Sequence, residues 1–294
     1  MRFPLKTFTF IGIAFIAIGT VGLAWLYQET DGFAQERSEF KHEKTIDAAA
    51  IQHISVKADY AEVVLLPGKD SDIHVSFQGS ALNSMEKQVS FKAETQPSDT
   101  AVIEALIHKK FQTGIDIPQI FDLINGNLRP KLEITVPDKM YRSLQVKGDI
   151  GSVRIEGLQA QTAKLSTDVG TLSVDGFKSD SFKASTDTGA MNIKDVSGAV
   201  ELESGIGAIH LSLSEFNQDA VVYSDIGGIS VKLPRTDAMR VDIKSEIGAS
   251  TVNLPDMVFT SNDNHNIQGT IGDKNKGPLL KIRSDIGGVS VGLR

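Results

Sequence analysis

The chain has 294 residues, a net charge of -7, 40% apolar and 23% charged residues, and no cysteine. This composition is globular and excludes a disordered tail, a collagen and a multi-span membrane protein, while the missing thiols exclude disulfides, thiolate metal sites and cysteine nucleophiles. The acidic balance argues against a nucleic-acid partner. Aromatic residues make up only 6% whereas glycine occurs 26 times, which indicates many turns around an aliphatic core.

The first element in chain order is an uncharged apolar run from Phe8 to Tyr27. A helix of about 20 residues spans roughly 30 Å, so we predict a transmembrane helix over 8–27 that has the lipid bilayer as its partner. Basic residues precede the run and acidic residues follow it, which predicts a cytoplasmic tail over 1–7 and an extracytoplasmic C-terminal domain. A signal peptide cleaved after Ala34 is the alternative, and it places the domain on the same side of the membrane.

A charged stretch over 28–50 predicts an extracytoplasmic linker. The region 51–140 then predicts an irregular, β-rich start of a repetitive structure. Its strand-like stretches of alternating apolar residues are 73–77, 89–93 and 132–136. A short helical insert is predicted near 116–126, because Pro118 fits a first helical turn and Gly126 fits a helix end. This insert either caps an open end of the fold or contacts a membrane or a partner.

The region 141–294 repeats a strand, a corner at Asp-Ile-Gly or a variant of it, and a second strand, about every 19 to 20 residues. Apolar residues alternate with a spacing of two around each corner, which is the period of a β-strand. We therefore predict an all-β, single-domain parallel β-solenoid of short coils, preceded by one transmembrane helix. Both strands of each unit, and the residue before the corner glycine, are expected to turn apolar side chains inward.

Glycine closes every corner, which predicts a positive φ or a close backbone approach at that position. These turn glycines are Gly151, Gly170, Gly189, Gly207, Gly227, Gly248 and Gly287. A degenerate copy of the corner lies upstream at Asp59, Tyr60 and Ala61. Residues 255–279 are rich in Asn, Asp and Gly, and we expect them to form a polar loop that replaces most of one coil.

The corner carboxylates should stack in one column. They are Asp149, Asp168, Asp187, Asp225 and Asp285, with Glu246 in the same column and Gly205 interrupting it. Like charges about 5 Å apart repel by roughly 1 kcal/mol per pair in water, which favours a bound cation such as Ca²⁺. In the interpretation that we prefer, each Asp instead accepts hydrogen bonds from the amides of its own turn, since the G-G-x-G-x-D signature is missing. No other metal site, catalytic residue or cofactor site is identified, because the six histidines lack zinc-motif spacing.

Two further features point to surfaces. Val221 and Tyr223 occupy outward positions, where they either form a partner-binding patch or, as we prefer, lie beneath the loop 255–279. The sequence ends at Arg294 directly after a predicted strand. We therefore expect an open C-terminal edge of the solenoid, through which the chain forms a homo-oligomer by strand addition.

The apolar run, the LEITVP segment from Leu132 and the Asp-Ile-Gly coils together resemble the bacterial putative-adhesin family of unknown function. This resemblance implies a β-solenoid outside the cell and no known catalytic residues. An anchored member of that family is encoded in a cell-envelope stress operon. We therefore expect a non-enzymatic, membrane-anchored binding or scaffolding element whose partner is a cell-wall polymer or a membrane protein. A modulator of an envelope stress response, acting through membrane-protein contacts, is the alternative, and a glycan-acting enzyme is the third interpretation.

Overall fold

The structure is a computed structural model that describes residues 16, 19–22, 25, 37–82, 89–97, 99–107 and 130–294. The chain divides into two compact units, and the first comprises Met1–Glu39, Ser80–Lys87 and Lys110–Leu128. Its described residues are helical at 16, 19–22 and 25 and extended at 37–39 and 80–82. Within the described part of the chain, no helix has the length and apolarity that a bilayer span requires.

Several sequence predictions fall on residues that the structure does not describe. The cytoplasmic tail over 1–7 and the helical insert near 116–126 lie wholly outside the described residues, and so does the signal-peptide cleavage site. The apolar run over 8–27 is described only at the few helical positions given above. These assignments therefore stay predictions.

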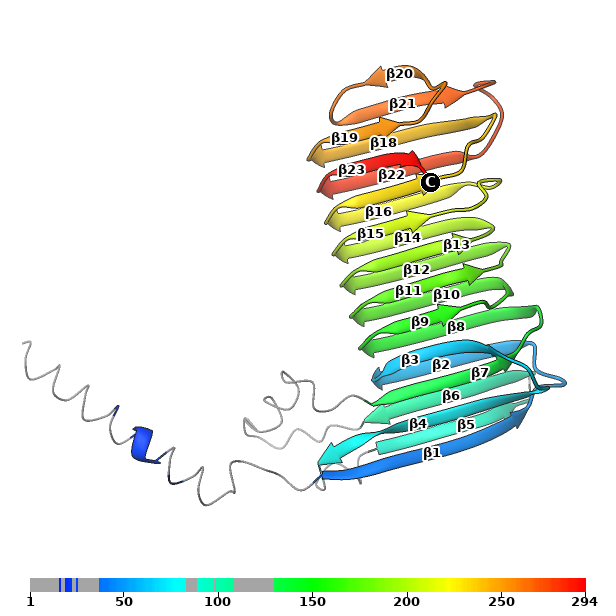
Figure 1. Ribbon diagram of the computed structural model, residues 1–294, viewed down its shortest axis with the longest axis vertical. Helices are drawn as coiled ribbons and strands as arrows, with labels where there is room; N and C mark the ends of the chain where they lie inside the picture. The colour runs from blue at the N-terminus through cyan, green and yellow to red at the C-terminus, as the bar shows by residue number, and fades with distance from the viewer. Residues whose placement is uncertain are drawn as a thin grey trace, which may run out of the picture. The chain divides into compact units, whose positions relative to one another are not determined.

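The second unit comprises Phe40–Gly79, Gln88–Lys109 and Arg129–Arg294 and is a stack of coils built from two sheets (Figure 1). In spatial order, the first sheet contains β1 (Arg37–Asp47), β4 (Asp72–Leu82), β7 (Lys131–Pro137), β3 (Glu62–Gly68), β9 (Val153–Glu156), β11 (Leu172–Phe177), β13 (Met191–Val196), β15 (Ile209–Ser212), β17 (Ile229–Leu233), β23 (Val289–Leu293) and β19 (Ser250–Asn253). The second sheet contains β20 (Val258–Asn262), β21 (Asn266–Ile271), β18 (Met239–Ile247), β22 (Leu279–Ile286), β16 (Ala220–Ile226), β14 (Ala199–Ile206), β12 (Ser181–Thr188), β10 (Ala160–Val169), β8 (Tyr141–Ile150), β2 (His53–Tyr60), β6 (Thr100–Ile107) and β5 (Val89–Gln96).

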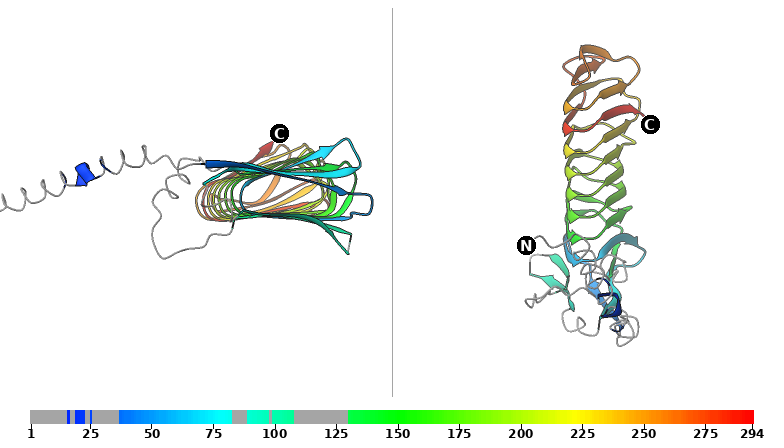
Figure 2. Two further views of the ribbon diagram at one scale, coloured as in Figure 1. Left: turned by 90° about the horizontal axis from the view of Figure 1, so that it is seen from below. Right: turned by 90° about the vertical axis from the view of Figure 1, so that its left-hand side faces the viewer.

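Successive coils stack in parallel with residue-for-residue register. Ala163 in β10, for example, pairs with Leu144 in β8 on one side and with Phe182 in β12 on the other. Viewed along the stack, the coils superpose as a flattened ring with two long walls (Figure 2). The prediction of an all-β solenoid is confirmed, and its two sheets are mostly parallel where the sequence predicted a parallel structure. The strands predicted at 73–77, 89–93 and 132–136 are also confirmed.

The core between the two walls consists of stacked aliphatic side chains. Leu165, Val174 and Ile193 are each at most 2% exposed. The space holds few large rings because the walls lie close together, as they do between packed sheets. Phe177 and Phe182 are both fully buried in this core, and their ring centroids are 5.7 Å apart.

The N-terminal layer corrects the linker prediction over 28–50, because residues 37–47 form β1 at one edge of the first sheet. Phe40 and Ile46 are buried, and the Phe40 ring lies 5.0 Å from that of Phe77. The residues between them, 41–45, are exposed and mostly charged, so the sequence of this strand lacks the alternation of apolar residues that predicts a strand. The same layer contains the antiparallel pairs β4–β7 and β5–β6, whereas the repeated coils above it are parallel.

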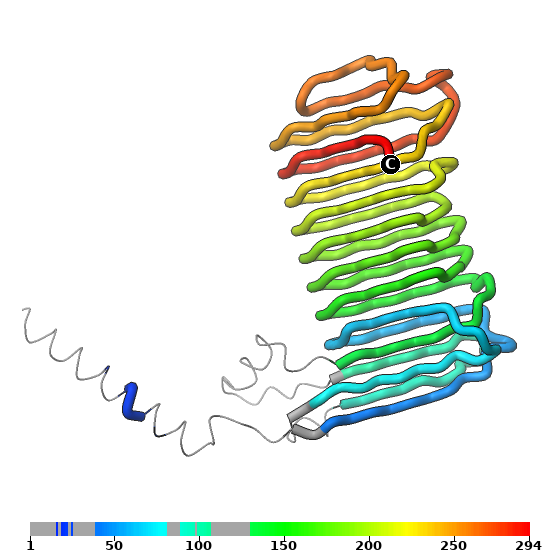
Figure 3. The backbone as a smooth tube through the Cα atoms, viewed as in Figure 1, coloured from blue at the N-terminus to red at the C-terminus, as the bar shows by residue number. Residues whose placement is uncertain are grey.

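The prediction of an open C-terminal edge is wrong. The strands β22 and β23 and the final residue Arg294 together form one coil, which we call the C-terminal coil. β22 pairs with β16 and β18, and β23 pairs with β17 and β19. The last strands of the sequence therefore lie inside the stack, one rung below the coil formed by residues 239–253 (Figure 3). Because β23 has a neighbour on each side, the homo-oligomer predicted through an open C-terminal edge loses its structural basis.

The polar segment 255–279 is not the loop that the sequence predicts, because it contains the antiparallel hairpin β20–β21. β21 pairs with β18 and places Ile267 and Ile271 on the core, while β20 is largely exposed. Asp263 forms the turn by accepting hydrogen bonds from the amides of His265 and Asn266, both at 2.8 Å. The sequence of this segment resembles a loop because the hairpin covers one end of the stack. Only one face of β21 packs against the core, so few apolar residues are needed.

Candidate binding surface

The corner glycines stack directly on one another along one edge of the solenoid. Gly170 has φ +151°, and a Cβ at this position would overlap the carbonyl oxygen of Gly151 in the coil below. The prediction of positive φ and close backbone approach is therefore confirmed for all seven predicted turn glycines. The degenerate corner predicted upstream is confirmed as well, since the Ala61 amide bonds the carbonyl of Ile150 and Tyr60 pairs with Ile150.

The residue before each corner glycine points outward, which corrects the inward orientation predicted from the sequence. We call these side chains the aliphatic ridge. In spatial order they are Ile150, Val169, Thr188, Ile206, Ile226, Ile286 and Ile247. The six aliphatic members are 41 to 64% exposed. At about 4.8 Å per rung, this row of seven positions is roughly 29 Å long.

The strand alternation ends one residue before the ridge. In β10, Leu165 and Thr167 point into the core, whereas Asp168 and Val169 both face solvent because the backbone turns at the corner. The inward position next to each corner holds a small hydroxyl residue in six of the coils. These residues are Thr167, Thr186, Ser204, Ser224, Ser284 and Ser245. This column of small Ser and Thr residues marks the last inward position of each strand, after which two consecutive side chains face solvent.

The predicted carboxylate column exists and flanks the ridge on the side of the second sheet. Asp187, Asp225 and Glu246 are exposed, and Asp149, Asp168 and Asp285 are partly exposed. The structure describes no group of three or more carboxylate or histidine side chains that could hold a metal ion. Lys147 lies 3.5 Å from the carboxylate of Asp149. The column thus places six carboxylates beside the ridge, of which the one at Asp149 is paired with Lys147.

Val221 and Tyr223 lie on the outer face of β16 and are about one third exposed. They are not beneath 255–279, because the hairpin β20–β21 packs beyond β18 and not on β16. The negative charges of Asp285 and Asp225 raise the pKa of the Tyr223 phenol. Tyr223 therefore lies close to the carboxylate column, between Glu203 and Arg283 of the adjacent coils.

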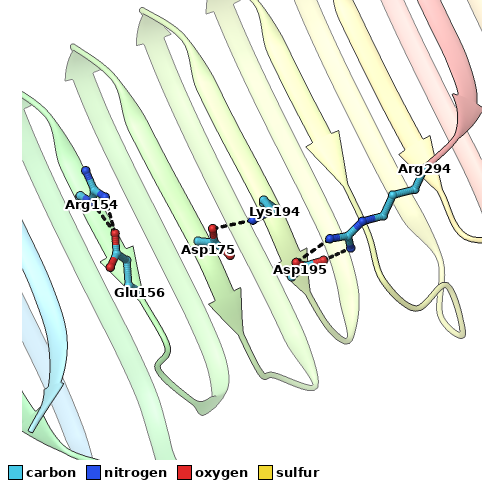
Figure 4. Close-up of polar contacts among 6 residues, drawn as sticks. All are labelled: Arg154, Glu156, Asp175, Lys194, Asp195 and Arg294. Carbon is cyan, nitrogen blue, oxygen red and sulfur yellow. Dashed lines mark hydrogen bonds and ion pairs between the residues drawn. The ribbon is translucent and has the colours of Figure 1, made fainter.

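The outer face of the first sheet is charged and locally paired (Figure 4). Arg154 bonds Glu156 within its own strand, and Lys194 bonds Asp175 of the adjacent coil at 2.9 Å. Arg294 bonds Asp195, and this contact holds the pKa of the Asp195 carboxyl below its ordinary value. This wall is a solvated charged face, in contrast to the ridge.

A polar cavity of about 150 Å³ lies at the opposite corner, where Ser179, Ser197 and Phe216 are among its lining residues. Small-molecule sites usually enclose about 300 to 1,000 Å³. The ridge and its acidic flank are therefore the surface features that best fit recognition of a partner.

These features define the chain as a repetitive β-solenoid that exposes a largely aliphatic edge, interrupted at Thr188. It belongs to the Toastrack family, DUF4097, whose model matches residues 51–291. No curated protein is significantly similar to it in sequence.

Three crystal structures are similar to this chain at low identity. A putative cell adhesion protein from Clostridium sporogenes is 12% identical, with a TM-score of 0.41 over 87% of this chain and 100% of its own. A putative adhesin from Bacteroides fragilis is 12% identical, with a TM-score of 0.46 over 86% and 98%. A putative lipid binding protein from Parabacteroides distasonis is 14% identical, with a TM-score of 0.32 over 86% and 97%.

Proposed function

We propose that this chain is a non-enzymatic binding or scaffolding element of the bacterial cell envelope, held on the extracytoplasmic side of the membrane by residues 8–27. The uncharged run from Phe8 to Tyr27 and the charges around it support the anchor and its orientation. The observation that carries the binding function is the aliphatic ridge. Six of its seven positions hold exposed aliphatic side chains, and large exposed apolar patches on monomeric proteins commonly mark interaction sites.

The chemistry of this edge selects the kind of partner. Aliphatic side chains of the ridge, such as Ile206 and Ile226, offer an apolar contact, and the column from Asp149 to Glu246 offers negative charge beside it. Complementary potentials guide association and specify the partner. The partner is therefore a protein surface that presents aliphatic residues next to lysine or arginine. A wall glycan presents mostly hydroxyl groups and complements this edge less well.

A second candidate function follows from the same partner chemistry. The anchor together with this domain resembles LiaG, the membrane-anchored member encoded in the Lia cell-envelope stress operon of Bacillus. In that role, the ridge contacts another membrane protein and modulates an envelope stress response. This alternative differs from scaffolding in its consequence for signalling and not in the surface that it uses.

Binding of three probes tests the proposal: an alternating Leu-Lys peptide, a Ser-Lys peptide of the same charge, and purified peptidoglycan. The Leu-Lys peptide is expected to bind at least tenfold more tightly than the Ser-Lys peptide, and more weakly at high salt. The pair Ile206→Ser and Ile226→Ser should remove that preference. The matched control is Asn192→Ala with His210→Ala, two exposed neighbours on the first sheet. Peptidoglycan binding that survives the ridge substitutions would assign a glycan partner instead.

A further inference from the structure

The C-terminal coil fills a slot between two coils that precede it in the sequence. The coil of β16 and β17 bounds the slot on one side, and the coil of β18 and β19 bounds it on the other. The chain passes over this slot after β17, forms the coil 239–253 and the hairpin β20–β21, and then returns to fill the slot. The slot is thus a site for a coil, and the chain's own last coil occupies it.

The two coils that bound the slot pair with the C-terminal coil in the same register. Leu280 lies between Ala220 and Val241, and the same one-to-one pairing continues along the coil. On the other sheet, Val291 lies between Val231 and Val252. Recognition therefore depends on the backbone ladders and on a repeated aliphatic pattern, and an identical coil from another molecule satisfies both.

The C-terminal coil is joined to the hairpin by residues 272–278 alone. Seven extended residues span at most about 23 to 25 Å, which is the largest distance that can separate the coil from the hairpin after it leaves the slot. Gly272 and Gly277 give this segment two positions with positive φ. At the far end, the coil is held by the hydrogen bonds between Arg294 and Asp195, whose side chains are 37% and 26% exposed. Exposed ion pairs contribute little stability, so this contact is a weak latch.

We propose that the C-terminal coil exchanges between two copies of this chain, each donating residues 279–294 to the slot of the other. The strand pairing that breaks within one molecule forms again between the two molecules, so exchange costs little at equilibrium and depends on protein concentration. Backbone pairing by an inserted strand is an established mode of protein association. The partner for this site is therefore a second copy of the chain.

Disulfide trapping between two single variants tests this proposal, because the chain has no cysteine of its own. Ser230 and Ser290 are paired on the outer face of the first sheet, so Ser230→Cys and Ser290→Cys are near-isosteric changes at facing positions. When the two variants are mixed, partially unfolded and returned to native conditions, a disulfide-linked dimer is expected. The control mixes Ser230→Cys with Thr251→Cys, because both positions lie outside the exchanged residues 279–294 and exchange of the coil therefore never pairs them between two molecules.

The Arg294→Ala background is expected to increase the rate of dimer formation severalfold, because it removes the latch. Dimer yields equal to the control in both backgrounds would overturn the proposal. Where the cysteine variants fail to fold, hydrogen exchange of the unmodified chain decides. The amides of β22 and β23 should then exchange well before those of β16, and equal protection in these strands would overturn the proposal.

Discussion

Arg294 donates two hydrogen bonds to the carboxylate of Asp195. Arg294 directly follows β23 and Asp195 lies in β13, and the strands β15 and β17 separate β23 from β13. The Nη2–Oδ2 distance is 2.9 Å, and the two residues are 99 positions apart in sequence. The contact ties the inserted C-terminal coil to a coil formed much earlier in the chain. It also gives the fold a specific dependence on pH.

The change Arg294→Ala is expected to lower Tm by about 1 to 2 °C at neutral pH, since an exposed pair contributes little. The hydrogen bonds from Arg294 lower the folded-state pKa of Asp195. Such a carboxylate stabilises the fold above its unfolded pKa of about 3.9, and this contribution disappears as pH falls through the lower, folded pKa. The Tm difference between the two proteins should therefore shrink toward zero in acid.

Thermal unfolding of both proteins from pH 7 down to about pH 2.5 measures this difference. Arg154→Ala is the matched control, because Arg154 bonds Glu156 within its own strand and links no distant coils. A Tm difference between wild type and Arg294→Ala that is constant across this pH range would contradict the role given to Asp195.

The glycine column is expected to tolerate no side chain. Gly170→Ala should lower the free energy of unfolding by about 3 kcal/mol or more, because the methyl group overlaps the Gly151 carbonyl at a positive φ. Gly228→Ala is the control, since the nearest atom to its Cβ lies 3.8 Å away. This second change should stay within about 0.5 kcal/mol of wild type. Denaturant unfolding distinguishes the two, and equal effects would refute the stacked-corner geometry.

Substitutions of two isoleucines in one coil, one on the ridge and one in the core, are expected to change the free energy of unfolding by very different amounts. Ile206 is 53% exposed and Ile209 is fully buried. Ile206→Ser should change the free energy of unfolding by less than about 1 kcal/mol, whereas Ile209→Ala should lower it by about 2 to 4 kcal/mol. Chemical denaturation measures both. A loss at Ile206 as large as that at Ile209 would mean that the ridge is structural and not a contact surface.

The buried hydroxyl column is expected to reduce stability. The Thr186 hydroxyl is buried and has no hydrogen-bond partner among the described atoms. Thr186→Val keeps the shape and removes the unpaired group, so it should raise the free energy of unfolding by about 1 kcal/mol. The control is Thr162→Val, whose hydroxyl donates to the carbonyl of Arg142 at 3.1 Å. A clear loss of stability in Thr186→Val would indicate a buried water bound to this hydroxyl.

The fold class follows from the sequence because each coil repeats the same apolar alternation and the same corner glycine. The order of the coils in space does not follow, because all coils share one register and any two of them can pair. The double interval between Glu246 and Asp285 was the single hint, and it is equally compatible with a loop. Strand β1 escapes prediction for a different reason, since only Phe40 and Ile46 of its described side chains are buried.

The candidate surface is only half predictable. The carboxylate column comes directly from the spacing of the Asp residues along the repeat. The ridge does not, since a strict period of two places Ile206 and its equivalents inward. The corner breaks that period by turning two consecutive side chains, such as Asp225 and Ile226, toward solvent. Only the buried Ser and Thr residues beside the corner signal this change in the sequence.

Photocrosslinking in intact cells tests the ridge most directly. A photoreactive amino acid replaces Ile206 in one variant and His210 in the other, two exposed positions four residues apart on different faces of one coil. We expect Ile206 to give a defined crosslink to one protein partner, and the His210 variant to give none. The Ile206→Ser change in an otherwise wild-type chain should also prevent that partner from co-purifying with the protein. The same products from both positions, or no product from Ile206, would contradict a partner-binding ridge.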